Sequence, residues 1–277
     1  MENFLNKFFF RSNNLSYISH SLINLSKQTP AKKIFEALNT YSDTSEVRYV
    51  GGCIRKVIKK ETVDDIDLAT NLKPKEVCDA LKKKDINFYE TGLEHGTITA
   101  VIDEHKYEIT SLRKDVSTDG RHANVEFSQD WKEDAARRDF SINSIYSDKE
   151  GNLFDPYDGK KDLENGIINF IGDAEDRIKE DYLRILRYIR FFLNYSNQSH
   201  NPEIIKIIKR SIEGISNLSS ERLIDELKKL TKSNGFIKIF KDKISLELLE
   251  IIFPQLKNLK NLKKLNSFAV ENLSKID

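Results

Sequence analysis

The sequence predicts an α+β fold in which a small mixed sheet with flanking helices is followed by an all-helical region. In residues 97–102 and 107–110, mainly polar side chains alternate with apolar ones on the two sides of a polar turn. This pattern indicates a hairpin. From residue 180 onward, apolar residues instead recur at helical spacing. With 277 residues, the chain can form one large or two modest domains.

Helices are expected on both sides of these strands. Proline opens an amphipathic helix over residues 30–39, a short strand follows at residues 47–50, and another helix begins at residues 73–75. We expect residues 1–45 to form a helical segment that packs on the sheet-containing domain. After residue 195 we expect helices only, over residues 202–210, 219–232, 235–240 and 246–253.

The charge of the chain is balanced overall but uneven along its length. The formal net charge is +1, yet the chain from Ser196 onward holds 13 Lys and 2 Arg against 10 acidic residues. The first 195 residues are therefore net acidic. An acidic front and a basic rear suit a partner that carries many phosphates, although exposed lysines on helices are more often a solvated face.

Cysteine content and hydropathy bear on the location of the chain. Cys53 and Cys78 are too few for a disulfide framework or a zinc site, which predicts a reducing, cytoplasmic setting. No apolar run approaches the ~20 residues that span a bilayer, so we expect no membrane association. The Ser- and Asn-rich N-terminus leaves an organellar presequence as an alternative. No obligatory protein partner is indicated.

Two adjacent glycines, Gly51 and Gly52, follow the short strand and precede a helical run that contains Arg55. Glycines allow a backbone to approach another group closely, and the unpaired N–H groups of a first helical turn bind phosphate. Arg55 can add a bidentate contact. The pattern therefore suits a triphosphate, although alone it is most often a tight turn.

Two carboxylates follow ten residues later. Asp65 and Asp67 share one face of an extended segment, while Ile66 and Leu68 point toward the core. Neighbouring carboxylates repel each other unless a cation lies between them, and Mg²⁺ bound by carboxylates and substrate phosphates is a common arrangement. The pair therefore predicts a Mg²⁺ site. Glu108, on the second strand of the hairpin, is a candidate third acid.

Four further segments have recognisable patterns. Residues 113–131 lack an apolar period and indicate a solvent loop with a turn at 119–122. Residues 137–144 read Arg-Arg-Asp-Phe-Ser-Ile-Asn-Ser, for which a surface ion-pair cluster is the ordinary interpretation. Residues 155–163 contain a Pro-x-Asp-Gly turn that opens a helix. Residues 180–191 predict one helix on which a charged stripe recurs every three residues, at Asp181, Arg184, Arg187 and Arg190.

Taken in order, these motifs resemble the nucleotidyltransferase superfamily and, in detail, the class II CCA-adding tRNA nucleotidyltransferases with the related bacterial poly(A) polymerases. The resemblance covers about residues 46–232. It implies a polymerase beta-like catalytic head, a neck with a nucleotide-selecting helix, and a partial helical body, at residues 46–158, 159–232 and 233–277. Ser141 and Asp158 stand where the family more often has Thr and Gly.

The resemblance also implies roles for single residues. Residues 113–131 would be the flexible loop that helps the enzyme to change from adding C to adding A, and residues 155–163 a hinge between head and neck. Arg138 would contact the nucleotide, Asp139 would order the ribose end, and Asn143 would support the sheet. The implied nucleotide-binding set is Gly51, Gly52, Arg55, Arg137, Arg138, Asp139, Asn143, Asp181, Arg184, Arg187 and Arg190.

Base selection follows from the chemistry of the fourth motif. A carboxylate such as Asp181 accepts from the exocyclic amine of cytosine or adenine, and a guanidinium such as that of Arg184 donates to the adjacent ring nitrogen. Uracil and guanine present the opposite pattern on that edge. The resemblance thus implies that C and A are accepted without a nucleic-acid template.

The implied activity is addition of C and A from CTP and ATP to the 3′ end of tRNA, with loss of pyrophosphate. Asp65, Asp67 and Glu108 are its implied catalytic residues, and Mg²⁺ is its cofactor. The alternatives are an A-only enzyme or poly(A) polymerase and, in another class, a non-catalytic RNA-binding module. The chain is shorter than expected for the family, whose further helices grip the tRNA elbow, so it is either a reduced form or a fragment.

Overall fold

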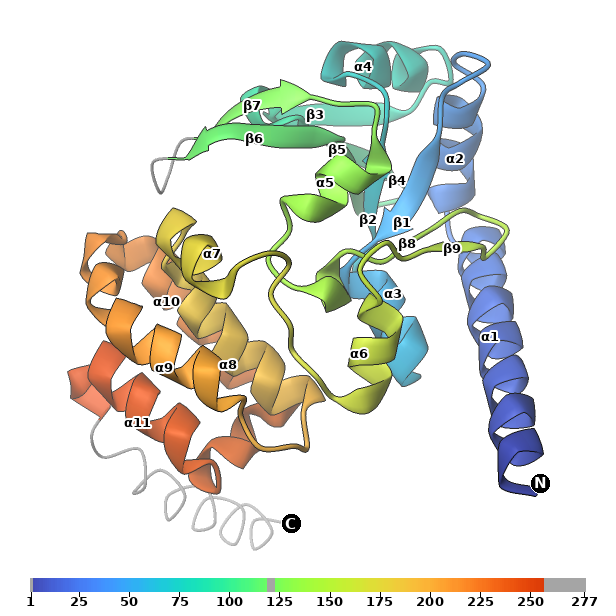
Figure 1. Ribbon diagram of the computed structural model, residues 1–277. Coiled ribbons are helices and arrows are strands. Elements are labelled where there is room, and N and C mark those ends of the chain that lie inside the picture. Colours follow the sequence, from blue (N-terminus) through green and yellow to red (C-terminus); the bar gives the residue numbers. More distant parts are fainter. Residues whose placement is uncertain (1, 119–122, 257–277) are drawn as a thin grey trace, which may run out of the picture. The chain divides into compact units, whose positions relative to one another are not determined.

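The computed structural model describes residues 2–118 and 123–256, and its side chains over residues 15–114 and 125–256. The chain divides into two compact units (Figure 1). The first unit holds the chain up to Asn165 together with Asn169–Gly172. The second holds Gly166–Ile168 and the chain from Asp173.

The first unit is built on a seven-stranded mixed sheet with the strand order β3-β4-β5-β2-β1-β8-β9. Neighbouring strands are antiparallel, except that β2 and β5 are parallel. The parallel pair requires a crossover, which α4 (Pro74–Lys82) and the next two strands supply. The strands are β1 (Val47–Val50), β2 (Asp67–Thr70), β3 (Asn87–Gly92), β4 (Thr97–Ile102), β5 (His105–Ser111), β8 (Tyr146–Ser147) and β9 (Leu153–Phe154).

Helices cover the apolar face of this sheet. Tyr49, Leu68 and Ile109 are fully buried on that face, and Phe35 of α2 (Ala31–Asn39) packs on Tyr49 with ring centroids 4.8 Å apart. α1 (Glu2–Gln28) contacts α2 and α3 (Gly52–Lys59), and its Ile18 is fully buried. The predicted helix at residues 30–39 and strand at 47–50 are both present.

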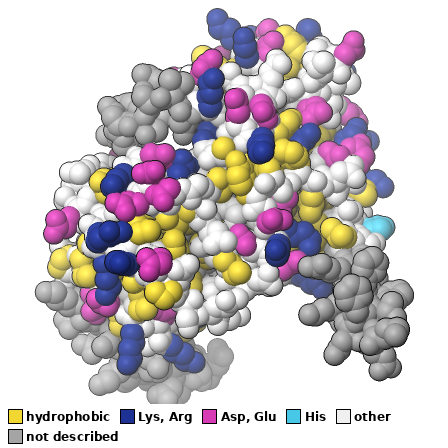
Figure 2. All heavy atoms as spheres, in the orientation of Figure 1, with side chains coloured by type: hydrophobic (Ala, Val, Ile, Leu, Met, Phe, Trp, Pro, Cys, Tyr) yellow, Lys and Arg dark blue, Asp and Glu magenta, His cyan; other side chains and the backbone are white. Residues whose placement is uncertain are grey.

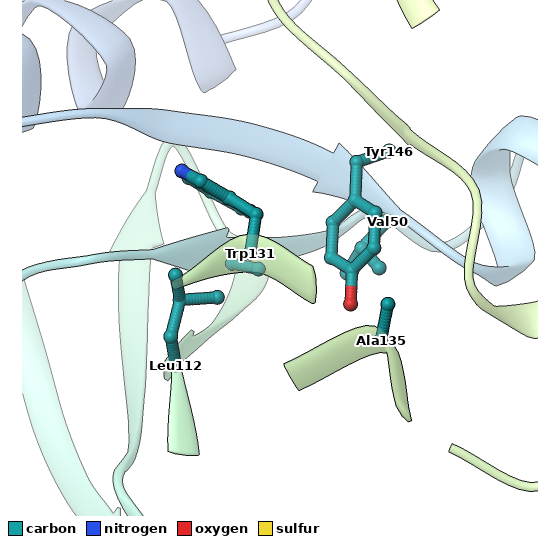
Figure 3. Packing of buried hydrophobic residues seen from close by; sticks show 6 residues of the cluster. Val50, Leu112, Trp131, Ala135 and Tyr146 are labelled. Atoms are coloured by element: carbon teal, nitrogen blue, oxygen red, sulfur yellow. The ribbon is translucent and has the colours of Figure 1, made fainter. Parts of the chain in front are cut away.

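The other face of the sheet is covered at one end by α5 (Trp131–Ala136). Figure 3 shows its Trp131 and Ala135 packed with Val50, Leu112 and Tyr146 in a buried cluster, the Tyr146 hydroxyl pointing toward α5. The Trp131 and Tyr146 rings meet edge to face with centroids 5.4 Å apart. The cluster fixes α5 against the sheet, next to the part of the same face that carries acidic side chains.

The solvent loop predicted for residues 113–131 is a hairpin for most of its length. Strands β6 (Arg113–Thr118) and β7 (Ala123–Phe127) pair antiparallel in a separate two-stranded sheet. Main-chain hydrogen bonds hold such a ribbon without an apolar side-chain period, which explains why the sequence pattern missed it. The turn predicted at residues 119–122 lies outside the described residues.

The second unit consists of helices over its described residues. The chief elements are α7 (Ala174–Glu180), α8 (Leu183–Tyr195), α9 (Pro202–Ser211), α10 (Ser220–Lys232) and α11 (Lys243–Ile252), with 3₁₀ turns η3 (Ile212–Asn217), η4 (Asn234–Phe240) and η5 (Pro254–Leu256). α8 is the most buried of them, with Ile185, Leu186 and Ile189 at most 1% exposed. The helix predicted at residues 235–240 corresponds to the 3₁₀ segment η4.

Charged side chains of both signs are interspersed over the molecular face in Figure 2. Within the described residues, no helix combines the length and the apolar character that crossing a membrane requires. Cys53 and Cys78 are buried thiols without a disulfide.

Candidate active site

The predicted acidic residues lie on neighbouring strands of the first unit. Asp67 is the first residue of β2 and lies opposite Glu108 of the parallel strand β5. Asp65 precedes the strand and is exposed, whereas Ile66 and Leu68, which alternate with the acids, are 8% and 0% exposed. The alternation therefore directs both aspartates away from the core.

Asp67 lies in a strongly anionic environment. Burial and the nearby charges of Asp65 and Glu108 raise its pKa to about 6, and the positive charges of Arg138 and Arg55 act in the opposite direction. Binding of a proton or of a cation reduces the electrostatic repulsion at such a carboxylate. Among the described residues, no group of three or more His, Cys, Asp or Glu side chains is arranged as a metal site. A metal on the two aspartates would need further ligands from substrate phosphate and water.

The N-terminus of α3 lies beside Asp67. Its first residue, Gly52, follows Gly51, which has a φ of 64° and so favours glycine. A Cβ atom at Gly51 would lie 3.9 Å from guanidinium nitrogens of Arg55 and Arg138, and one at Gly52 would lie 3.8 Å from Oδ2 of Asp67. These are ordinary contact distances, so packing within the chain does not demand Gly52. The glycines leave room there for a phosphate to approach the first-turn N–H groups and both guanidiniums.

A carboxylate outside the predicted set holds the two adjacent arginines. Asp134 of α5 is 1% exposed and accepts hydrogen bonds from Arg137 at 2.6 and 2.8 Å, from Arg138 at 3.1 and 3.2 Å, and from the Tyr146 hydroxyl at 2.6 Å. Burial alone would raise the pKa of Asp134, but the charges of Arg138 and Arg137 and the Tyr146 hydrogen bond hold it well below its usual range. The surface ion-pair interpretation is therefore wrong, because the carboxylate is buried. The sequence did contain a signal for this contact, because Asp134 lies three residues before Arg137 and four before Arg138, the spacing at which side chains meet on a helix.

Asp139 and Asn143 belong to a 3₁₀ turn, η2 (Ser141–Asn143), and the residues before it. Asp139 is buried, and its Oδ1 accepts from the Phe140 N–H at 2.9 Å and from Asn143 Nδ2 at 2.6 Å. Asn143 Oδ1 in turn accepts a hydrogen bond from Arg55. The turn thus links Asp139 to the guanidinium that faces the glycines, and one oxygen of the Asp139 carboxylate is used within the turn itself.

The single helix predicted for residues 180–191 is interrupted at Asp181. This residue is extended, with φ −154° and ψ 103°, between the end of α7 and the start of α8. Its Oδ1 accepts from the Leu183 N–H at 3.1 Å, and its Oδ2 accepts from Arg222 of α10 at 2.8 Å. The expected stripe is wrong at this position, because a side chain that caps the next helix cannot continue the previous one.

The three arginines of the predicted stripe do lie on α8, and they have partners within the second unit. Arg184 is buried and donates to the Arg177 carbonyl and to Glu180, both at 2.6 Å. Arg190 donates to buried Glu226 at 2.5 Å. The Arg187 guanidinium carbon lies 5.5 Å from the centroid of the Phe191 ring.

The predicted site residues therefore fall into two groups. The first unit brings together Gly51, Gly52, Arg55, Asp67, Arg138 and Asn143, with Asp65, Glu108, Arg137 and Asp139 next to them. The second unit holds Asp181 and Arg184, each bonded to a neighbour of opposite charge.

Comparison with known proteins identifies related sequences for both units. Residues 47–169 match the family described as "Poly A polymerase head domain", and residues 201–260 match "Probable RNA and SrmB- binding site of polymerase A". The chain is 43% identical over 195 residues to "CCA tRNA nucleotidyltransferase 1, mitochondrial" of Homo sapiens, an alignment that covers 69% of this chain and 45% of the relative.

Bacterial relatives give the same result. The "CCA-adding enzyme" of Staphylococcus haemolyticus is 35% identical over 224 residues, which cover 80% of this chain and 54% of the relative. The crystal structure of the Bacillus stearothermophilus CCA-adding enzyme in complex with CTP superimposes with a TM-score of 0.67 at 28% identity, covering 79% of this chain and 51% of that one. The chain spans about half the length of the curated relatives it matches. It belongs to the family of CCA-adding tRNA nucleotidyltransferases and poly(A) polymerases.

Proposed function

We propose that this chain adds C and A, from CTP and ATP, to the 3′ end of tRNA without a nucleic-acid template. The observation that carries the proposal is the position of Asp67 beside the glycine-opened N-terminus of α3 and close to the guanidiniums of Arg55 and Arg138. This set can hold a triphosphate and a cation together. The names of the human and bacterial relatives support the choice of tRNA, CTP and ATP as substrates.

The proposed reaction is an in-line displacement at the α-phosphorus of the incoming nucleotide. The 3′ oxygen of the tRNA forms a bond to that phosphorus, the bond from the phosphorus to the β-phosphate oxygen breaks, and pyrophosphate leaves. Arg55, Arg138 and the first-turn N–H groups of α3 bind the triphosphate oxygens. We assign the hydroxyl proton to Glu108, which is exposed and lies opposite Asp67.

Asp65 and Asp67 fit a divalent cation, and we propose Mg²⁺. The carboxylate of Asp67 is partly buried and lies near the like charges of Asp65 and Glu108, and carboxylate oxygens are the ligands that Mg²⁺ prefers. When bound, the ion supplies charge neutralisation at the triphosphate and acidifies the attacking hydroxyl. The protein's own part is to hold the two carboxylates and the phosphate-binding groups in register.

Asp181 and Arg184 are the residues that we propose for base selection. In this proposal each residue exchanges its present partner for a base, Asp181 leaving Arg222 and Arg184 leaving Glu180. Cytosine and adenine offer the matching amine donor and ring-nitrogen acceptor. Uracil and guanine leave both side chains facing a group of the wrong kind.

The proposal is tested with tRNA that lacks its terminal CCA, incubated with each NTP alone and in mixtures, followed by sequencing of the product. We expect two C and one A to be added, after which addition stops. Products that contain A alone would identify an A-adding enzyme instead. Binding of tRNA without incorporation of any nucleotide would identify a non-catalytic module and overturn the proposal.

A further inference from the structure

The segment at residues 155–163, in which the sequence predicts a hinge, has no part in the proposed chemistry. The hydrogen bonds described for its Asp155 and Asp162 all lie within the first unit. We propose that Asp162 is a positioning residue, which holds the turn η2 and, through Asn143, the Arg55 guanidinium in the geometry that binds the triphosphate. The inference rests on the proposed nucleotidyl transfer and deepens it.

The segment first forms the short helix α6 (Gly159–Asn165) against the turn η2. The Asp155 carboxylate accepts from the N–H groups of Gly159 and Lys160, both at 2.8 Å, and so fixes the first turn of α6. A Cβ atom at Gly159 would lie 2.0 Å from the carbonyl oxygen of Ser141 and 2.6 Å from its carbon. Glycine is therefore required there by close approach, and α6 touches the backbone of η2.

Asp162 makes the polar connection between α6 and η2. Its Oδ2 accepts from the Ser141 hydroxyl at 2.6 Å and from Asn169 Nδ2 at 3.0 Å. The Ser141 N–H donates to the Asn169 carbonyl at 3.0 Å, so the turn is bonded to both α6 and the strand-like segment after it. Ser141 is 3% exposed, and a hydrogen bond lost there is not replaced by water.

The turn η2 contacts Arg55 through Asn143. Asn143 lies two residues after Ser141 in the same turn and bonds both Asp139 and Arg55. A carboxylate only accepts and a guanidinium only donates, so these partners determine which way the amide of Asn143 faces. Its backbone oxygen lies 3.6 Å from the Cβ position at Gly51. A shift of η2 would therefore move Arg55 and one wall of the glycine cradle together.

The test is a double-mutant cycle read by equilibrium binding of CTP in the presence of Mg²⁺ and without tRNA. We expect Asp162→Ala to weaken CTP binding about tenfold, within the range for leaving the buried Ser141 hydroxyl without its acceptor. In an Arg55→Ala background, the same substitution should change CTP binding less than about twofold, because Asp162 acts through Arg55. Ser141→Ala removes one hydroxyl only, and it keeps the cycle available if Asp162→Ala does not fold.

A matched control is Asp148→Ala. Asp148 also accepts two hydrogen bonds within the first unit, from the N–H and Nδ2 of Asn152, both at 2.8 Å, but it has no bond to η2. We expect CTP binding to be unchanged in this variant. The inference would be overturned, without the proposed function, if the effects of Asp162→Ala and Arg55→Ala on CTP binding were additive. It would also be overturned if CTP binding were unchanged in both Asp162→Ala and Ser141→Ala. A wild-type chain that binds no CTP with Mg²⁺ would overturn the proposed function as well.

Discussion

The two units treat their functional arginines in different ways. In the first unit, the buried carboxylate of Asp134 holds Arg138 from one side, while another guanidinium nitrogen of Arg138 faces the glycines at the start of α3. In the second unit, the acid and the arginine proposed for base selection are already bonded to other residues. Asp181 is bonded to Arg222, and Arg184 is bonded to Glu180.

The difference shows two ways of building recognition. Groups held by a buried partner are in place before the ligand arrives, and little further ordering is needed when phosphate binds. Groups that exchange a partner for the ligand gain net binding only where the ligand replaces the hydrogen bonds that are lost. Such groups therefore contribute more to selectivity between ligands than to affinity. We infer that the first unit supplies affinity for the triphosphate and the second supplies selectivity for the base.

The largest effect should come from removing a metal carboxylate in the first unit. We expect Asp65→Ala and Asp67→Ala each to reduce incorporation at least about 10³-fold while the chain stays folded, because the cation loses a ligand. Mg²⁺ should raise the unfolding temperature of the wild-type chain but not of these variants. The exposed Asp43→Ala is the matched control. Substantial incorporation in both aspartate variants would remove the two-carboxylate assignment.

Gly52→Ala should separate ligand binding from stability. The added methyl meets its neighbours at ordinary contact distances, and alanine in a helix is favoured over glycine by up to about 1 kcal/mol, so the unfolding temperature should hold or rise. CTP affinity should nevertheless fall about tenfold or more, because the methyl occupies space beside the phosphate. Gly92→Ala, which also meets only ordinary contacts, should leave CTP affinity unchanged. Undiminished affinity in Gly52→Ala would contradict the cradle.

Asp181→Ala tests the second unit. Loss of the acceptor for the exocyclic amine should cost about 1–3 kcal/mol of discrimination, so UTP and GTP would be incorporated about 5- to 150-fold more readily relative to CTP and ATP. Total CTP affinity should fall less than in Gly52→Ala. The measurement is incorporation of each NTP, with exposed Asp225→Ala on α10 as the control. Unchanged selectivity in both Asp181→Ala and Arg184→Ala would show that these residues have a structural role and do not select the base.

The smallest effect concerns pH. Burial lowers the pKa of His200, against the opposing charge of Asp242, so the folded second unit binds fewer protons than the unfolded chain below the ordinary histidine pKa of about 6.5. Its stability should therefore fall as the pH drops through that value toward the lowered pKa. The depressed pKa of Asp134 changes stability in the same direction, since the unfolded chain again binds more protons, but it does so only in stronger acid, below the ordinary aspartate pKa.

Hydrogen exchange at pH 7 and pH 5 measures this difference directly. We expect α8 and α11, which His200 joins through Tyr188 and Asp242, to lose protection before α5 does. His200→Gln should remove the difference between the two pH values in α8 and α11. An equal pH dependence in that variant would show that His200 does not cause it.

Local patterns sufficed for some elements and failed where main-chain pairing or distant partners decide. The strand predicted at residues 47–50 has the observed bounds, and the helix predicted at residues 30–39 differs by one residue at its start. Each of them has its own apolar period. The edge strand β3 is largely exposed, and β6 pairs with β7 in a separate two-stranded sheet, so neither needs such a period. The break at Asp181 depends in part on Arg222, which lies 41 residues away.

The same division applies to the candidate site. Gly51, Gly52 and Asp67 could be found from spacing alone, because a glycine turn and alternating carboxylates are visible along the chain. Asp134 and Asp162 could not, since their importance depends on which side chains the fold brings to them.

The one parallel pairing in the seven-stranded sheet has a kinetic consequence. α4 and two further strands separate Asp67 from Glu108 along the chain, so their pairing closes a long loop. Such non-local pairings form slowly compared with hairpins and helices. During refolding, helical signal should return first, and the ability to bind CTP should return only with the slowest phase. The anionic pair would then be assembled late, when most of the sheet is already present to hold the two charges in place.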